Sequence, residues 1–144
     1  MLTERATATI AIVMAALLAG CLPDYFPRRK LRGISEAQVV GKWKLTQSYP
    51  PAAWSEDAQA EFFAGGRCTL HKFAYGDDET SGDYTWQIDV EAGSKGSVLR
   101  VTGFGTPQHP LWMSFYFTRQ HGKLVLWQYI GDPDSRQYIE YERI

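Results

Sequence analysis

The chain has 144 residues, of which 44% are hydrophobic and 22% charged, and its formal net charge is -1. This length predicts one domain, and the balance of apolar and charged residues excludes a wholly disordered chain. The near-neutral charge argues against a protein that binds nucleic acid through overall positive charge, so we expect no nucleic-acid partner.

An apolar run close to the start of the chain predicts an export signal. Residues 10–19 contain only aliphatic side chains and methionine. This run is too short to cross a bilayer as a helix, which needs ~20 residues. Its length is typical of the apolar region of a signal peptide, so we assign residues 1–20 to a cleaved signal.

The end of this run carries a second, more specific pattern, Leu18-Ala19-Gly20-Cys21. It resembles the lipobox of bacterial lipoproteins. The resemblance implies cleavage before Cys21, diacylglycerol on its sulfur and fatty acylation, such as palmitate, of its amino group, so that the protein is anchored to a lipid bilayer. Because Leu22 rather than Asp follows the cysteine, the resemblance also implies an outer-membrane location facing the periplasm. An ordinary signal followed by an unmodified cysteine is the alternative.

Residues 21–38 are interpreted as the lipidated end and a tether. They include Pro23 and Pro27 and show no apolar periodicity. The segment also contains a basic cluster, namely Arg28, Arg29, Lys30 and Arg32. We interpret this cluster either as a contact with anionic head groups or as a solvated spacer. Ser35 is placed to cap a short helical turn that ends at Gln38.

From Val39 onward the apolar residues repeat with a period of two, which predicts strands. The expected strands cover 39–46, 58–63, 67–75, 83–91, 97–104, 111–119, 123–130 and 138–143. Short connections rich in Gly, Asp and Pro separate them. We therefore predict an all-β fold over residues 39–144, an eight-stranded antiparallel up-and-down barrel, with a two-sheet sandwich as the alternative.

The segment Gly41-Lys42-Trp43 resembles the G-x-W motif on the first strand of lipocalins. Similar features follow it, namely Phe62, the Gly65-Gly66 turn with Arg67, Gly82-Asp83-Tyr84 and a closing strand rich in Tyr and Glu. The resemblance covers residues 39–144 and implies a lipocalin-like barrel. It further implies that Trp43 closes the base of the barrel beneath an arginine of a late strand, for which Arg143 is the candidate.

Two cysteines occur, Cys21 and Cys68. If Cys21 carries lipid, no disulfide can join them. We therefore expect Cys68 to be a buried, unreactive side chain in a strand. His71 is close in sequence, but residues three apart on a strand lie on opposite faces, so a Cys68–His71 pair is disfavoured.

Sequence patterns of catalysis are not apparent. There is no nucleophile elbow and no glycine-rich phosphate loop. The three histidines, His71, His109 and His121, have no ligand spacing, and the acidic turns lack the pattern of a calcium loop. We expect a non-enzymatic protein without a metal site or cofactor.

The first functional interpretation, suggested by the lipocalin resemblance, is a binder of a small hydrophobic ligand or lipid inside the barrel. The candidate cavity residues are Trp43, Tyr84, Trp86, Phe115, Phe117 and Tyr141. The same large side chains are also sufficient to fill a narrow barrel completely, which would leave no cavity.

The second interpretation is a module that binds a periplasmic protein, as an inhibitor of an enzyme or an assembly partner. The strands at 111–119 and 123–130 are apolar on both faces, so one set of aromatic rings must face outward. The candidate partner surface is Trp112, Tyr116, Trp127 and Tyr129. The tether or the loop at 50–57 would cover this surface in the alternative view, and a passive envelope component is a third interpretation.

Overall fold

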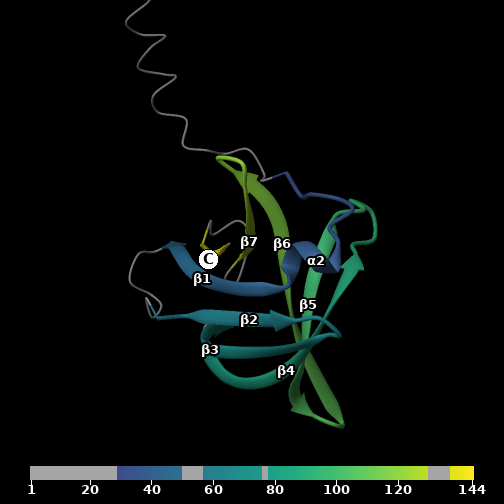
Figure 1. Ribbon diagram of the computed structural model, residues 1–144. Coiled ribbons are helices and arrows are strands. Elements are labelled where there is room, and N and C mark those ends of the chain that lie inside the picture. The colour runs from purple at the N-terminus through teal and green to yellow at the C-terminus, as the bar shows by residue number, and fades with distance from the viewer. Residues whose placement is uncertain (1–28, 50–56, 76–77, 130–136) are drawn as a thin grey trace, which may run out of the picture.

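The computed structural model describes residues 29–49, 57–75, 78–129 and 137–144 (Figure 1). The strands are β1 (Gly41–Tyr49), β2 (Gln59–Phe63), β3 (Arg67–Tyr75), β4 (Asp78–Val90), β5 (Ser97–Thr106), β6 (His109–Gln120), β7 (Lys123–Tyr129) and β8 (Tyr138–Arg143). They form one closed barrel in chain order, and each neighbouring pair, including β1 with β8, is antiparallel. The predicted eight-stranded up-and-down barrel is confirmed, and the sandwich alternative is wrong.

The segment before β1 closes one end of the barrel. Helix α2 (Glu36–Val39) begins after Ser35, and the backbone N–H of Ser35 donates to Oε1 of Gln38 at 2.9 Å, which is the Gln38 half of a capping box. Ile34 and Val39 are buried in the core. Val39 therefore belongs to a helix rather than to the first strand. We call the end crossed by residues 31–39 the closed end (Figure 1).

Residues 30–38 are part of the folded unit, which corrects the assignment of 21–38 to a tether. The backbone N–H of Leu31 donates to the Phe117 carbonyl at 3.0 Å, and the N–H of Ser97 donates to the Leu31 carbonyl at 2.7 Å. Leu31 thus bridges β5 and β6 where the two strands approach the closed end. The barrel needs these backbone bonds because the strand ends would otherwise leave polar groups unsatisfied.

The middle of the barrel is filled by aromatic rings. Phe73 stacks on Tyr141 with 4.2 Å between centroids, and it meets Phe115 edge to face at 5.2 Å. All three side chains are fully buried. Burial of rings of this size supplies a large share of the hydrophobic stabilisation of so small a domain.

The β5–β6 hairpin projects beyond its neighbours at the end opposite the closed end (Figure 1). The ladder between β4 and β5 reaches only Thr85–Thr102, and the ladder between β6 and β7 stops at Tyr116–Trp127. The hairpin therefore extends past both ladders. Within the described part of the chain, no helix has the length and apolar character needed to cross a membrane.

Candidate functional site: a groove at the closed end

The six predicted cavity residues do not behave alike. Trp43, Phe115, Phe117 and Tyr141 are fully buried, Trp86 is 5% exposed, and Tyr84 is half-buried. Phe115 and Tyr141 pack edge to face at 6.0 Å, and Tyr84 stacks on Phe104 at 4.3 Å. These rings occupy the space that an interior ligand would need, and of the six only Trp86 lines the groove described next.

The groove lies where β4 passes the closed end, and its volume is about 600 Å³. Four apolar side chains contribute to its walls, namely Ile34, Trp86, Ile88 and Val90. Glu36, Gln87 and Ser97 add polar groups, and Gly33, Gly65 and Gly66 complete the lining. The groove is open to solvent on one side, and its volume falls within the range of small-molecule sites.

Backbone contacts fix the shape of the groove. The N–H of Trp86 donates to the Gly66 carbonyl at 2.7 Å, while its indole N–H donates to the carbonyls of Phe63 and Arg67 at 3.1 and 2.9 Å. A Cβ on Gly66 would lie 3.0 Å from the Trp86 carbonyl oxygen, so a glycine permits this close approach. The indole wall is therefore rigid.

Val90 shows where the alternation rule fails. The period-two pattern places it inside the barrel with Trp86, yet Val90 is 70% exposed. It pairs with Ser97 at the last rung before the β4–β5 turn, so it lies at the rim rather than within the barrel. The result is an apolar side chain left in solvent beside the half-buried Ile88, at the mouth of the groove.

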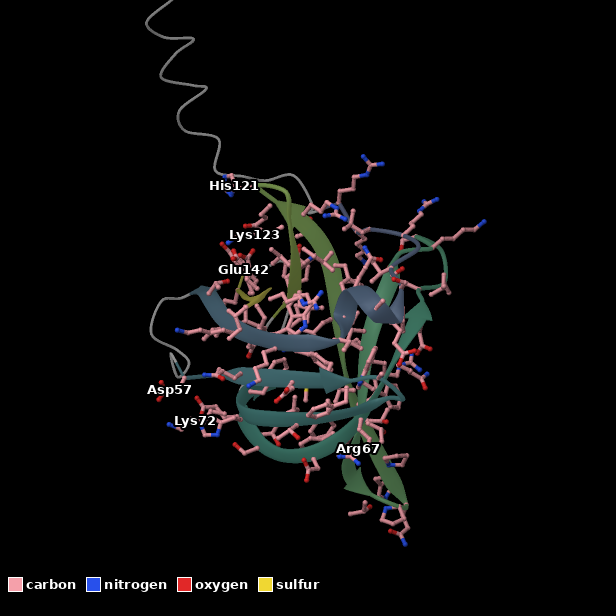
Figure 2. All side chains as sticks on the ribbon, viewed as in Figure 1. Asp57, Arg67, Lys72, His121, Lys123 and Glu142 are labelled. Carbon is pink, nitrogen blue, oxygen red and sulfur yellow. The ribbon has the colours of Figure 1, made fainter. Side chains whose placement is uncertain are left out.

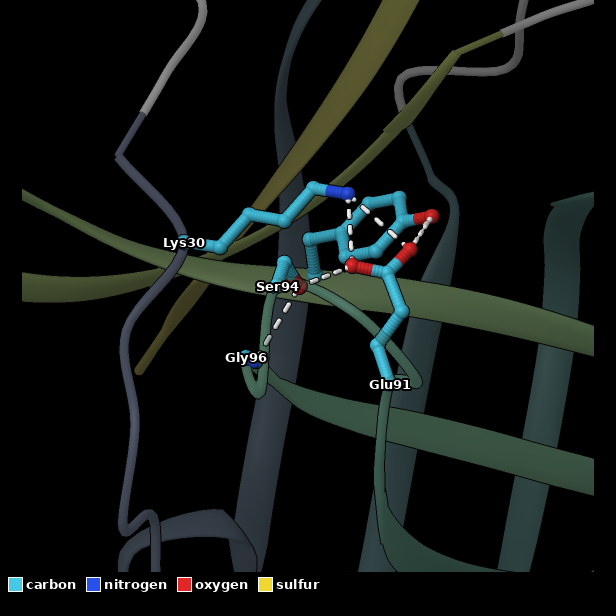
Figure 3. Close-up of polar contacts among 5 residues, drawn as sticks. Lys30, Glu91, Ser94 and Gly96 are labelled. Atoms are coloured by element: carbon cyan, nitrogen blue, oxygen red, sulfur yellow. Dashed lines mark hydrogen bonds and ion pairs between the residues drawn. The ribbon is translucent and has the colours of Figure 1, made fainter.

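A polar cluster fastens the N-terminal segment beside this rim (Figure 3). Lys30 Nζ lies 2.8 Å from a Glu91 carboxylate oxygen and 3.8 Å from the centre of the Tyr116 ring. The Tyr116 hydroxyl donates to Glu91 at 2.8 Å, and Ser94 also donates to this carboxylate. We call Lys30, Glu91, Ser94 and Tyr116 the clasp.

The clasp shifts the titration of its members. Hydrogen bonds from Lys30 and then Ser94 lower the pKa of Glu91 to about 2. Burial, followed by the hydrogen bond to Glu91, raises the pKa of Tyr116. Sequence reasoning missed the clasp because Lys30 and Glu91 are far apart in the chain, and no local pattern marks either of them.

The predicted partner surface is divided into two parts. Tyr116, Trp127 and Tyr129 do come together on the outer face, with ring centroids 5.2 and 5.1 Å apart. Trp127, however, is only 1% exposed, so the expectation that it is exposed is wrong. Trp112 lies apart on the projecting hairpin, where it is 55% exposed and has the Arg100 guanidinium 5.6 Å from its ring.

Trp43 and Arg143 are register partners on β1 and β8, at the closed end. The indole N–H of Trp43 donates to the Val39 carbonyl at 2.8 Å. The Arg143 guanidinium lies over Gly41, where an added Cβ would be 2.9 Å from Nε. The arginine therefore covers the glycine of the G-x-W motif. Among the described residues, cation–π contacts are made by Lys30 and Arg100 instead.

The remaining predictions concern the two cysteines and a metal site. Cys68 is buried as predicted, and burial, with a smaller effect from Asp83, raises the pKa of its thiol to about 12. Cys21 lies outside the described residues. Within those residues, no group of three or more His, Cys, Asp or Glu side chains is placed to hold a metal ion.

Comparisons with known proteins add little to this picture. No family model matches the chain, and no curated protein matches it. Among solved structures the chain is similar to insecticyanin from the tobacco hornworm Manduca sexta, with 12% identity and a TM-score of 0.46. The superposition covers 84% of this chain and 68% of insecticyanin. The eight-stranded up-and-down barrel itself rests on the strand pairing described above.

Proposed function

We propose that the protein is a lipid-anchored lipoprotein of the bacterial envelope that binds the apolar part of a small lipid-like molecule in the groove at the closed end. The observation that carries the binding proposal is the apolar rim formed by Ile88 and Val90 beside the rigid Trp86 indole. Covering this rim would remove apolar surface from water, which is favourable by ~25 cal/mol per Å².

The anchor is proposed from the lipobox-like sequence ending at Cys21. Several acyl chains hold a protein stably on a bilayer, whereas one chain does so only marginally. Labelling cells with a palmitate analogue tests this proposal. Label should enter the wild-type chain and not a Cys21→Ser chain, and a Cys21→Ser chain that keeps the label would overturn it. Fractionation of the labelled protein tests the proposed outer-membrane location facing the periplasm.

A photoreactive fatty acid that carries a diazirine tests the groove. After irradiation of the anchored full-length protein, peptide mapping should place adducts within residues 86–90. Val90→Gln should reduce these adducts several-fold, because it adds a polar group to the apolar rim. The matched control is Leu111→Gln, which alters an apolar residue that is 49% exposed on the hairpin. Adducts that are unchanged by Val90→Gln would refute binding in the groove.

A second candidate function is docking of a periplasmic protein on the β5–β6 hairpin. The observation that favours it is the exposure of Leu111 and Trp112, 49% and 55%, on a hairpin that projects from the barrel. Large exposed apolar side chains at a protruding site are typical of protein interfaces.

Cross-linking in intact cells from a photoreactive residue at Gln108, the hairpin turn, would test this candidate. A defined cross-linked protein should disappear when Trp112 is replaced by alanine and persist when Val90 is replaced by alanine. Cross-links that survive Trp112→Ala would refute the candidate.

A further inference from the structure

Basic side chains from three separate segments gather at the closed end. The cationic end, as we call it, consists of Arg29, Arg32, Lys95 and Arg119, all exposed. Leu31 bonds to Phe117, which brings the segment 29–32 beside the stretch of β6 that carries Arg119. The Lys30 side chain lies 3.0 Å from an ideal Cβ on Gly96, next to Lys95.

The carboxylates near this end are already engaged. Glu91 pairs with Lys30 at 2.8 Å, Glu142 pairs with Lys123 at 3.3 Å, and Glu36 accepts the N–H of Gly65 at 2.9 Å. None of the ion pairs formed by the described residues includes a member of the cationic end. The Gly65 N–H does not neutralise Glu36, but the four cations of the cationic end outnumber this one carboxylate. The end therefore presents net positive charge, although the whole chain is close to neutral.

Two of the described acidic residues, Asp57 and Glu79, lie at the end of the barrel opposite the closed end. Asp57 pairs with Lys72 at 3.6 Å, far from the labelled His121 and Lys123 (Figure 2). Glu79 follows the β3–β4 connection, which is opposite the closed end in an up-and-down barrel. The charge is thus polarised along the barrel, and the positive end is the end at which the chain arrives from Cys21.

We infer that the cationic end docks on the surface of an anionic phospholipid bilayer and orients the barrel with its closed end toward the membrane. The inference rests on the proposed anchor, which would hold this end close to the head groups. Residues 22–28 can span at most ~25 Å when fully extended. Basic residues so close to an anionic surface gain attraction that a neutral bilayer does not provide.

The test uses the full-length lipidated protein in vesicles of phosphatidylcholine, with or without phosphatidylglycerol. An environment-sensitive NBD dye is attached at Ala92→Cys in the β4–β5 turn, and in a second sample at Gln108→Cys in the β5–β6 turn. Flotation with the vesicles reports the anchor separately from docking. We expect a blue shift of the dye at position 92 only when phosphatidylglycerol is present, and no shift at position 108.

Removal of basic side chains tests whether the charge of the cationic end causes docking. Arg32→Gln/Lys95→Gln should lower the docked-to-undocked ratio by roughly 30-fold. The matched control is Lys44→Gln/Lys72→Gln, which removes two cations that do not belong to the cationic end and also includes one lysine with positive φ, as Lys95 has. The control should leave the ratio unchanged.

Protein that floats with the vesicles but shows the same spectra with and without phosphatidylglycerol would overturn the inference while leaving the anchor intact. An equal loss in both double variants would also overturn it. Inorganic phosphate, at matched ionic strength, should not reproduce the shift, and a shift with phosphate alone would assign the surface to a free anion instead. Protein that does not float would reject the anchor and the inference together.

Discussion

Replacement of Glu91 by glutamine should reveal how much the clasp contributes to stability. The substitution keeps the shape of the side chain and an acceptor for Tyr116, but it removes the charge that pairs with Lys30 at 2.8 Å. The two side chains are 30% and 27% exposed, so the pair is partly shielded from solvent. We expect a loss of ~1 kcal/mol in the free energy of unfolding at neutral pH, or a fall of about 4 °C in Tm.

The pKa of Glu91 predicts how its contribution to the free energy of unfolding changes with pH. The pKa of Glu91 is lowered from 4.5 to about 2 in the folded protein, so its contribution is complete above pH 4.5. It is lost as the pH falls from 4.5 toward 2, because in this range Glu91 binds a proton in the unfolded chain more readily than in the folded chain, and this favours unfolding. The stability difference between wild type and Glu91→Gln should therefore shrink across this range.

Urea unfolding, followed by tryptophan fluorescence at several pH values, measures this difference. Lys30→Met and the double variant complete a mutant cycle, which should return a coupling of ~1 kcal/mol near neutral pH. A coupling close to zero, or a difference that stays constant down to the acid limit, would refute the assignment of the clasp as an ion pair that fastens the N-terminal segment.

Three other predictions follow from single contacts. Gly41→Ala should destabilise the barrel by ~2 kcal/mol, since φ is +132° and the new Cβ would meet Arg143 at 2.9 Å; a chemical denaturation midpoint equal to that of wild type would contradict this. Cys68, with a thiol pKa of about 12, should resist a thiol reagent at pH 8 until urea unfolds the chain, and rapid labelling of the folded protein would disprove its burial. Trp127→Ser should lower Tm by several degrees more than Trp112→Ser, because their exposures are 1% and 55%; equal effects would argue against these placements.

The barrel could be predicted from the sequence because its strands obey a simple alternation. Trp86 and its neighbours on β4 repeat every two residues, and short turns rich in Gly and Asp separate consecutive strands. Such a pattern specifies antiparallel neighbours without knowledge of long-range contacts. The same rule failed at Val90, where the strand reaches the rim and alternation no longer distinguishes inside from outside.

The candidate site was less predictable, because residues from distant segments form it. The groove joins Ile34 to Trp86, and the clasp joins Lys30 to Glu91. The sequence shows the basic cluster around residues 28–32, but it does not show that Lys30 pairs with Glu91 of the barrel. Lys95 and Arg119 are far from this cluster in the sequence and come close to it only in the folded chain. Trp127 shows a second reason why the sequence was insufficient. The apolar residues on β7 indicate that one face of the strand points out of the barrel, but they do not indicate whether other side chains cover that face.

Two features meet at the closed end, and together they predict which molecules the proposed binding groove should prefer. Ser97 lines the groove and also bonds to Leu31, whose neighbour Arg32 belongs to the cationic end. An amphiphile with an apolar chain and an anionic head group would satisfy both features, with the chain against Val90 and the head group near the basic side chains. A neutral hydrocarbon would use only the first. Adducts of the photoreactive fatty acid should therefore exceed those of its methyl ester, and Arg32→Gln/Lys95→Gln should reduce this preference without abolishing the ester adducts.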